Sequence, residues 1–445
     1  MSVAPIGLNA TATPAVLANA RVNAICVLLS TIGVIGFGSF NQKLFGAGIS
    51  NLQQYAIVGL WSACALLCLG ANKIQSIDKI AVSIFTSIIL LSFSSSLWSP
   101  EPIDSASKAL VLVVTSLSAI FVVQAIGLEN AVKSLRRGLA IAVLTSILIV
   151  FLRPDVGLME TYLHVGKWRG IFGQKQLLGA SSSLLFVLYL YAKNGRMPLI
   201  RLAMLALCLL AIIYTESAVA LITVATVAMV KFTYSWKFVR SASAAAPVFL
   251  AIFAGVAVLW LGLTGEKSFW ILGEEVTAQN RTLIWEFALR AWADVALFGY
   301  GINGFWTNEV SLAQFQMENG WALDNFHSGY VATLAETGLF GYLLLIAFLA
   351  VKRSHIRRAM KSMGWKGVDP ILVGFPVYFF VLNLTETFLF RSTSTYFSLA
   401  IMVLVVSPFT TPTAQSEVSE KLISAQDNRI KKRESYLIHS RKNPA

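Results

Sequence analysis

The chain has 445 residues, of which 56% are hydrophobic and 13% charged, and its mean hydropathy is +0.69. A protein this apolar cannot cover its surface with polar side chains, so a water-soluble globular protein is excluded. Apolar runs of 17–23 residues recur along the sequence, and about 20 residues are needed for a helix to cross a hydrocarbon core of about 30 Å. Because backbone groups in lipid must be paired within each segment, we predict an all-α polytopic membrane protein.

The formal net charge of +13 could indicate a nucleic-acid partner, but its distribution argues against one. Of the 35 Lys and Arg residues, 25 fall in segments that alternate threading places on one side of a membrane. This bias predicts that both termini are cytoplasmic. All four cysteines lie inside apolar runs, so we expect packing residues rather than disulfides or a metal site.

Taken in chain order, residues 1–20 form a polar segment that we expect to be a disordered cytoplasmic N-terminus, with no cleavable signal. Residues 21–264 hold nine predicted transmembrane helices, 265–328 a large periplasmic loop, 329–408 three more helices, and 409–445 a basic cytoplasmic tail. The twelve predicted spans are roughly 22–40, 52–70, 79–98, 106–127, 136–152, 175–192, 198–215, 217–232, 244–264, 329–351, 370–386 and 392–408.

The large outer loop is long enough to fold on its own. Within it, apolar residues recur at helical spacing from Arg281 to Trp292, which predicts an amphipathic helix, and a glycine-rich turn follows from Gly299 to Gly304. Five tryptophans in this loop could stack on the C–H faces of sugars or pack a small domain onto the membrane surface. They are Trp270, Trp285, Trp292, Trp306 and Trp321.

A second outer segment carries a basic cluster, Lys167-Trp-Arg-Gly-Ile-Phe-Gly-Gln-Lys175. Trp168 and Lys175 fit anchoring at the level of the lipid headgroups. Arg169 fits that explanation less well, because basic residues are scarce on the outer side and glycines flank it. A guanidinium there suits bidentate capture of a phosphate.

Two arginines lie on the predicted amphipathic helix of the large loop. Arg281 opens it and could bind substrate or pair with a neighbouring carboxylate. Arg290 favours an ion pair with a residue such as Glu286, although a substrate contact stays open.

His327 stands where the large loop meets the tenth predicted span. The positive end of a helix dipole disfavours an imidazolium, and a neutral imidazole is what a general base needs. Asp324 would oppose this effect or orient the ring. Gly338 and Gly341 fall on the same predicted helix face as His327 and predict close helix packing below it.

Three carboxylates lie within or at the ends of predicted spans: Glu216, Glu336 and Glu386. Ionisable groups at such positions are candidates for function. Glu386 is close enough to Arg391 along the chain to form a structural ion pair instead.

These residues resemble three motifs of the O-antigen ligase and polymerase superfamily, and within it the ExoQ-like exopolysaccharide polymerases. Arg169-Gly-Ile-Phe-Gly-Gln-Lys-Gln-Leu-Leu-Gly179 resembles an Arg-Gly-x-Phe-x-x-Lys-Asn-x-x-Gly element. Arg281-Thr-Leu-Ile-Trp285 with Gly299-Tyr-Gly301 resembles an Arg-x-x-x-Trp and Gly-x-Gly loop. His327-Ser328, nine residues and Gly338-Leu-Phe-Gly341 match the motif His-[Asn/Ser/Gln]-x9-Gly-x-x-Gly at each fixed position. Gln176 and Glu216-Ser-Ala218 depart from the family pattern.

The resemblance implies a GT-C-like glycosyltransferase of the bacterial inner membrane whose site faces the periplasm. The donor would be a glycan on undecaprenyl diphosphate, and no metal or other cofactor would be needed. Arg169 and Arg281 would stabilise the departing diphosphate and His327 would deprotonate the acceptor hydroxyl. Substrate contacts are expected from Lys175, Arg290, Trp285, Tyr300 and Asp324.

The sequence therefore predicts a polymerase for exopolysaccharide synthesis, acting in the lipid bilayer beside flippase, chain-length and export proteins of the same pathway. One alternative is an O-antigen ligase, which would use the same donor and transfer to the lipid A core. A second alternative, of another class, is a flippase or transporter of lipid-linked oligosaccharide.

Overall fold

The fold is that of a computed structural model, which describes residues 21–29, 49–69, 73–160, 164–192, 198–264, 269–271, 274–276, 281–321 and 325–409. The predicted N-terminal segment 1–20, the tail beyond residue 409 and Asp324 lie outside the described residues. The longer helices are α3 (Ile49–Cys68), α4 (Lys79–Ser94), α5 (Pro102–Leu152), α7 (Lys175–Leu190), α8 (Pro198–Thr215), α9 (Ala218–Thr233), α10 (Lys237–Thr264), α11 (Arg281–Trp292), α12 (Glu309–Asn319), α13 (Gly329–Ser362), α14 (Ile371–Leu382) and α15 (Thr395–Val405).

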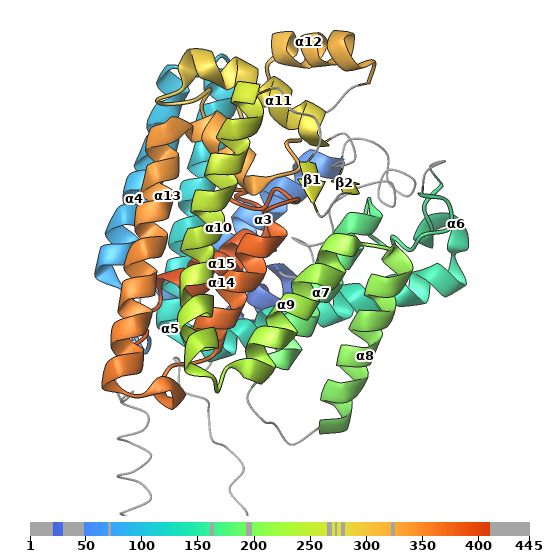
Figure 1. The fold of residues 1–445 in the computed structure, drawn as a ribbon. Helices are drawn as coiled ribbons and strands as arrows, with labels where there is room; N and C mark the ends of the chain where they lie inside the picture. The colour runs from blue at the N-terminus through green and yellow to red at the C-terminus, as the bar shows by residue number, and fades with distance from the viewer. Residues whose placement is uncertain are drawn as a thin grey trace, which may run out of the picture.

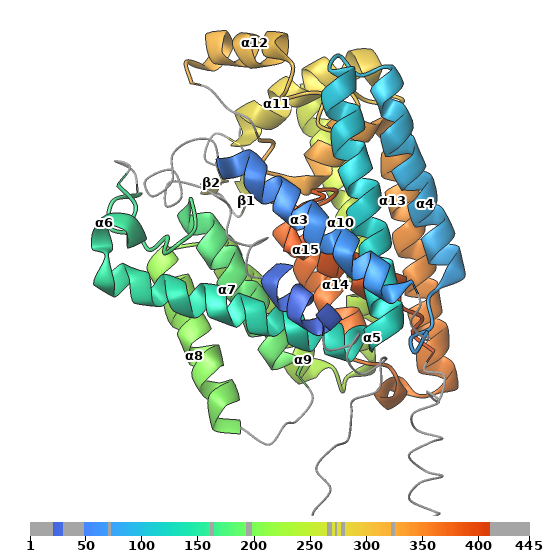
Figure 2. The same ribbon diagram turned by 180° about the vertical axis from the view of Figure 1, so that it is seen from behind.

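Four long helical segments run alongside one another: α4, α10, α13 and the first part of α5 (Figures 1 and 2). Helix α5 was predicted as two spans with a loop after residue 127. In the structure the helix continues through that region but bends at Gly127, whose φ of 77° and ψ of 156° are not helical. Residues 128–137 contain no proline or glycine to end the helix. The second part of α5 then runs toward α6 (Pro154–Gly157), on the side of the molecule that faces the viewer in Figure 2.

Helices α14 and α15 form the centre of the molecule (Figure 1). Every residue of α15 is buried, as is every residue of α14 except Val381. With 12 and 11 residues they rise only about 18 and 16 Å, less than a bilayer core requires. The irregular segment between them, residues 383–394, is therefore held by neighbouring protein, as backbone without helix must be at membrane depth.

The predicted outer loop folds over one end of the long helices, where α11 and α12 lie (Figure 1). The predicted amphipathic helix is confirmed as α11, with the same limits, Arg281–Trp292. The all-α prediction misses a short antiparallel hairpin of β1 (Phe269–Ile271) and β2 (Glu274–Val276).

The tryptophans of this region that the structure describes are packing residues more than an open sugar platform. Trp306 is buried and makes a T-shaped contact with Phe305 at 4.7 Å between ring centroids. Trp321 packs edge-on against Phe315 at 5.0 Å. Phe326, which directly precedes His327, contacts the same cluster through Trp306 at 5.3 Å. The cluster therefore fixes the loop that carries the histidine.

The chain is a multi-pass helical membrane protein. Five helices of the described residues are long and apolar enough to cross a membrane, at 79–97, 102–152, 198–215, 237–257 and 329–362. Five shorter apolar helices accompany them at 56–68, 175–190, 218–233, 371–382 and 395–405. The count of twelve spans and the topology stay predictions.

Candidate functional site

Arg281 begins α11 and lies next to a carboxylate from a distant part of the chain. Its Nη2 is 3.8 Å from Oε1 of Glu386, and both side chains are largely buried. One helical turn later, the indole N–H of Trp285 donates to the carbonyl oxygen of Phe326 at 2.8 Å. Helix α11 is thus joined both to the segment 383–394 and to the loop that carries His327.

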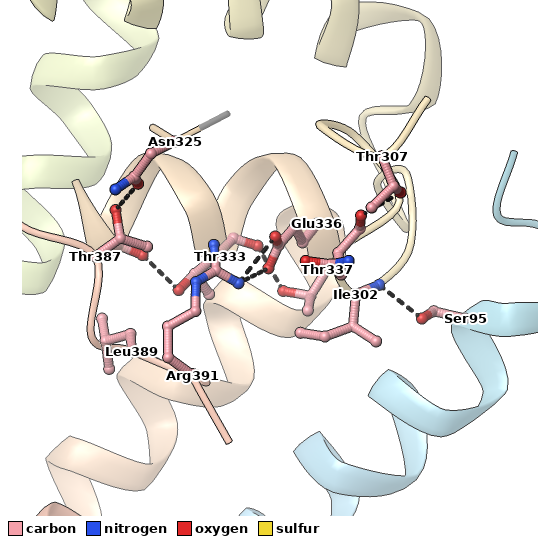
Figure 3. Close-up of polar contacts among 12 residues, drawn as sticks. Ser95, Ile302, Thr307, Asn325, Thr333, Glu336, Thr337, Thr387, Leu389 and Arg391 are labelled. Atoms are coloured by element: carbon pink, nitrogen blue, oxygen red, sulfur yellow. Dashed lines mark hydrogen bonds and ion pairs between the residues drawn. The ribbon is translucent and has the colours of Figure 1, made fainter. Parts of the chain in front are cut away.

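The backbone of His327 has a φ of 49°, which is uncommon for a residue with a side chain. Its N–H donates to Oδ1 of Asn325 at 3.1 Å, and the same oxygen accepts from the hydroxyl of Thr387 at 2.8 Å. Figure 3 shows Asn325 and Thr387 facing each other across this contact. The histidine therefore stands in a tight turn before α13 rather than in the helix itself.

The first residue of α13, Gly329, is hydrogen-bonded to the segment 383–394. The N–H of Gly329 lies 2.9 Å from the carbonyl oxygens of both Asn383 and Glu386. A Cβ at position 329 would come within 2.2 Å of Oδ1 of Asn383, so a larger residue does not fit. Asn383 in turn accepts from the N–H groups of Phe388 and Leu389, each at 2.9 Å. These contacts join Gly329, two residues after His327, to the segment whose Glu386 faces Arg281.

Glu386 lies in the irregular segment after α14 and pairs with Arg281, so the sequence-based alternative of a Glu386–Arg391 pair is wrong. Arg391 instead donates through Nη1 to both carboxylate oxygens of Glu336, each at 3.0 Å (Figure 3). Five residues of spacing allowed the predicted pair, but the irregular backbone turns the two side chains toward different helices.

The glycine motif after His327 works differently from the predicted packing face. Helix α13 is interrupted at Gly338, with φ of 68° and ψ of −173°, so helical spacing cannot be counted from His327 through it. The turn 296–300 docks here: the N–H of Tyr300 donates to the carbonyl of Ala335, and that of Leu339 donates to the carbonyl of Ala296, both at 2.9 Å. A Cβ at Gly338 would lie 2.3 Å from the carbonyl oxygen of Leu297.

Gly341 has another role in packing. A Cβ there would meet Oγ1 of Thr337 at 2.2 Å and a methyl of Leu91 in α4 at 3.1 Å. The two glycines therefore admit different neighbours, a loop in one case and a side chain of α4 in the other.

Arg169 and Lys175 belong to the segment between α5 and α7. Arg169 is buried, its Nε donates to the carbonyl of Val156 at 2.8 Å, and its Nη2 is 3.9 Å from Oε1 of Glu160. Gly170 has a φ of 60°, and a Cβ there would overlap Cβ of Ser146 at 2.2 Å. The backbone around the arginine is therefore closely shaped, as its flanking glycines predicted.

Lys175 is buried, and its ammonium donates to the carbonyl oxygens of Thr215 and Glu216 at 3.3 and 3.2 Å. Trp168 is also buried and stacks on Tyr214 with ring centroids 4.4 Å apart. Headgroup anchoring is therefore wrong for both. Lys167 forms an ion pair with Glu216 at 2.8 Å, and its hydrogen bond holds the pKa of that carboxyl below its usual value.

Helix α7 connects the two groups of residues indirectly. The hydroxyls of Ser181 in α7 and Tyr396 in α15 are 2.8 Å apart, and Tyr396 lies within electrostatic range of Glu386. The contacts of Arg169 are to Val156 and Glu160, whereas Arg281 faces Glu386. The meeting of both arginines in one cleft stays a prediction.

The other predicted substrate contacts have structural partners. Arg290 pairs with Glu318 of α12 rather than with Glu286, and both of these side chains are partly exposed. The hydroxyl of Tyr300 donates to the carbonyl of Ala291 at 3.0 Å. Within the described part of the chain, no group of three or more His, Cys, Asp or Glu residues is placed to hold a metal ion.

Sequence reasoning missed Asn383 and Thr387, which shape the turn around His327. Neither residue type stands out in a polar segment, because their role depends on contacts with residues more than 50 positions away. Glu336 and Glu386 did carry a signal, since an ionisable group in an apolar stretch marks a built polar site.

Comparison with known proteins places these contacts in a family context. Residues 182–346 match the family model described as O-antigen ligase, a stretch that includes Arg281, His327 and Gly338. The chain is also 25% identical over 332 residues to the exopolysaccharide production protein ExoQ of Rhizobium meliloti (strain 1021), covering 68% of this chain and 71% of that protein. The chain is thus O-antigen ligase-like over residues 182–346 and similar over about two thirds of its length to an exopolysaccharide production protein.

Proposed function

We propose that this protein is an inner-membrane polysaccharide polymerase that transfers an undecaprenyl-diphosphate-linked glycan onto a sugar hydroxyl during exopolysaccharide synthesis. The observation that carries the proposal is that the segment 383–394 contacts both Arg281 and the start of α13, two residues after His327. Helix α11, which Arg281 begins, also contacts Phe326, the residue before His327. A cation and a potential base at one place suit displacement of an anionic leaving group. The likeness to an exopolysaccharide production protein supports the choice of pathway.

In the proposed reaction, the acceptor hydroxyl oxygen forms a bond to the anomeric carbon of the donor. The bond from that carbon to the diphosphate oxygen breaks, and the lipid diphosphate leaves with the electron pair. Negative charge grows on the diphosphate, where the guanidinium of Arg281 stabilises it. His327 accepts the proton of the attacking hydroxyl, a step for which a neutral imidazole is suited.

Arg169 is proposed as the second cation on the diphosphate, with Lys175 holding the backbone turn at Thr215 and Glu216 near it. Its guanidinium is buried in a closely shaped segment. Arg290, Trp285, Tyr300 and Asp324 stay proposed contacts to the glycan or to the loop that carries it.

The wider setting is proposed on the same basis. The chain would have twelve spans in a GT-C-like arrangement with both termini in the cytoplasm, so that the site faces the periplasm. No metal would take part. Flippase, chain-length and export proteins of the pathway would work beside it.

An O-antigen ligase is the second candidate, because the matching family model carries that description. It would share the donor and the leaving group and differ in the acceptor, which would be lipid A core. A flippase is less well supported, since transport alone would not need a cation and a base beside each other.

The test is extension of a purified lipid-diphosphate repeat unit by the protein in liposomes, without added metal. Formation of longer glycan on the lipid carrier supports a polymerase. Product only when lipid A core is supplied supports a ligase, and movement of the donor across the bilayer without product supports a flippase. Arg281→Gln and Arg169→Gln should each lower turnover by about 10²- to 10³-fold, as loss of one charge-stabilising donor does elsewhere.

A further inference from the structure

Glu336 is a fully buried carboxylate in α13, two residues before the interruption at Gly338. Three structural elements meet at it. Its two oxygens accept from Nη1 of Arg391, each at 3.0 Å, and the backbone N–H of Asn303 also hydrogen-bonds to it. Figure 3 shows Arg391 reaching up from its loop to this carboxylate beside Thr333 and Thr337. One side chain thus joins α13, the turn 299–304 and the segment 383–394.

Both loops at this carboxylate are backbone-strained. Asn303 has a φ of 61°, and Phe390, next to Arg391, has a φ of 55°. Non-glycine residues hold such conformations only where the surrounding contacts impose them. The contacts to Glu336 come from Asn303 itself and from the residue after Phe390, so this carboxylate is placed to hold both strained turns.

The ion pair does not need to exist for stability. Burying two charges costs desolvation, and well-packed apolar residues of similar size are often as stable. The position of Arg391 is also electrostatically demanding, because Lys108 of α5 lies near enough to repel it. An anion at position 336 therefore directs where Arg391, and with it the segment 383–394, can lie.

That segment decides the geometry of the proposed site. Glu386 lies five residues before Arg391; its side chain faces Arg281 and its carbonyl oxygen accepts from Gly329, two residues after His327. Tyr300 of the turn 299–304 donates its backbone N–H to the carbonyl of Ala335 in α13. A shift of the segment 383–394 would move Glu386, the partner of Arg281, together with the turn that contains His327.

We propose that Glu336 is a positioning residue, whose contacts to Arg391 and Asn303 set the segment 383–394 so that Arg281 and His327 face the same substrate. This inference rests on the proposed function, and it requires the charge of Glu336 as well as its shape. Glu336 does not touch substrate in this scheme.

The experiment compares Glu336→Gln and Glu336→Asp with wild type in the liposome extension assay, with kcat and KM for the lipid-linked repeat measured separately. The amide keeps the size and loses the charge, whereas Asp keeps the charge on a shorter arm. We expect Glu336→Gln to lower kcat about 30-fold with KM changed less than threefold. Glu336→Asp should lower kcat by no more than about tenfold. A lower kcat for Glu336→Asp than for Glu336→Gln would overturn the proposal, because the shape of the side chain and not its charge would then determine turnover.

A matched control removes a buried carboxylate that contacts α13 toward its opposite end, Asp78 at the start of α4. Asp78 pairs with Lys352 of α13 at 3.6 Å and is equally buried. Asp78→Asn should lower thermal stability at least as much as Glu336→Gln while kcat stays within threefold of wild type. An equal loss of kcat in both variants would show general destabilisation and overturn the proposal.

A double-mutant cycle with Glu386→Gln tests the route of the effect. If Glu336 acts by placing the segment that carries Glu386, the fold-loss of kcat/KM in the double variant should be clearly smaller than the product of the fold-losses in the two single variants. Multiplicative losses would overturn the proposal. A wild-type protein that makes no product in the assay would instead count against the proposed function itself.

Discussion

Helix α13 carries a buried ionic cluster toward each end, and the two clusters are built differently. At the end near His327, Glu336 and Arg391 join irregular loops. Toward the other end, Lys352 and His355 meet Asp78, which begins α4 by accepting from the N–H of Ala81 at 3.1 Å. There the ammonium of Lys352 also donates to the carbonyl of Val406, just after α15, at 2.7 Å.

The difference lies in the backbone that each cluster holds. The cluster of Asp78, Lys352 and His355 joins ordinary helix ends, where a carboxylate at an N-terminus is favourable without strain. Around Glu336, left-handed conformations occur at Asn303, His327 and Phe390. Strain of this kind gathers where a structure imposes a geometry for function. We therefore expect changes at the first cluster to affect stability and changes at the second to affect turnover.

Replacing the histidine at each end gives the largest expected contrast. His327→Gln should lower turnover by about 10²- to 10⁴-fold, because the proposed general base is lost. His355→Gln, at the opposite cluster, should leave kcat within threefold of wild type. Both are measured by extension of lipid-linked repeats in liposomes. Full activity of His327→Gln would remove the histidine from the mechanism.

Two glycines with similar positive φ, one of them at the interruption of α13, should differ in how much stability an alanine costs. Gly338 and Gly364 have φ of 68° and 72°, but a Cβ at Gly364 meets nothing within 4 Å. Gly364→Ala should cost about 1–3 kcal/mol from backbone strain alone. Gly338→Ala should cost about 1–3 kcal/mol more, because its Cβ overlaps the Leu297 carbonyl.

Unfolding in detergent, followed by intrinsic tryptophan fluorescence, measures both glycine variants. Equal losses would mean that the turn 296–300 moves aside freely. The docking of that turn on α13 would then contribute little.

Much of this arrangement could be predicted from sequence wherever the signal is local. Helical spacing gave α11 its limits, and the motif of His327 and Gly338 marked the start of α13. The role of Gly338 could not be inferred from spacing, because its positive φ and its close approach to Leu297 depend on a loop 41 residues earlier. A regular α-helix was the simpler expectation.

The pairing of charges was beyond the sequence for the same reason. Glu386 and Arg391 are near neighbours along the chain, yet each pairs with a residue at least 55 positions away. The short helices α14 and α15 explain this outcome, because they place the segment 383–394 inside the protein among other helices rather than at a membrane surface. Apolar runs predict such helices but not where an irregular segment between them points.

Removing the cation of the unstrained cluster should affect stability and leave activity intact. Lys352→Met keeps the approximate length of the side chain and removes the ammonium that pairs with the buried Asp78. Loss of one partner from a buried pair costs about 3 kcal/mol or more, which is measurable in the same unfolding experiment. Turnover should stay within threefold of wild type. A Lys352→Met variant that is stable but inactive would give this cluster a functional role.

The smallest expected effect belongs to Glu386, whose carboxylate lies 3.8 Å from the guanidinium of Arg281. If this carboxylate holds Arg281 toward the donor, Glu386→Gln should raise KM for the lipid-linked repeat a few-fold, because the amide keeps the size of the side chain and loses its charge. KM is measured in the same liposome extension assay. A KM that is the same in both proteins would mean that the ion pair does not tune donor binding, and that Arg281 is held by α11 alone.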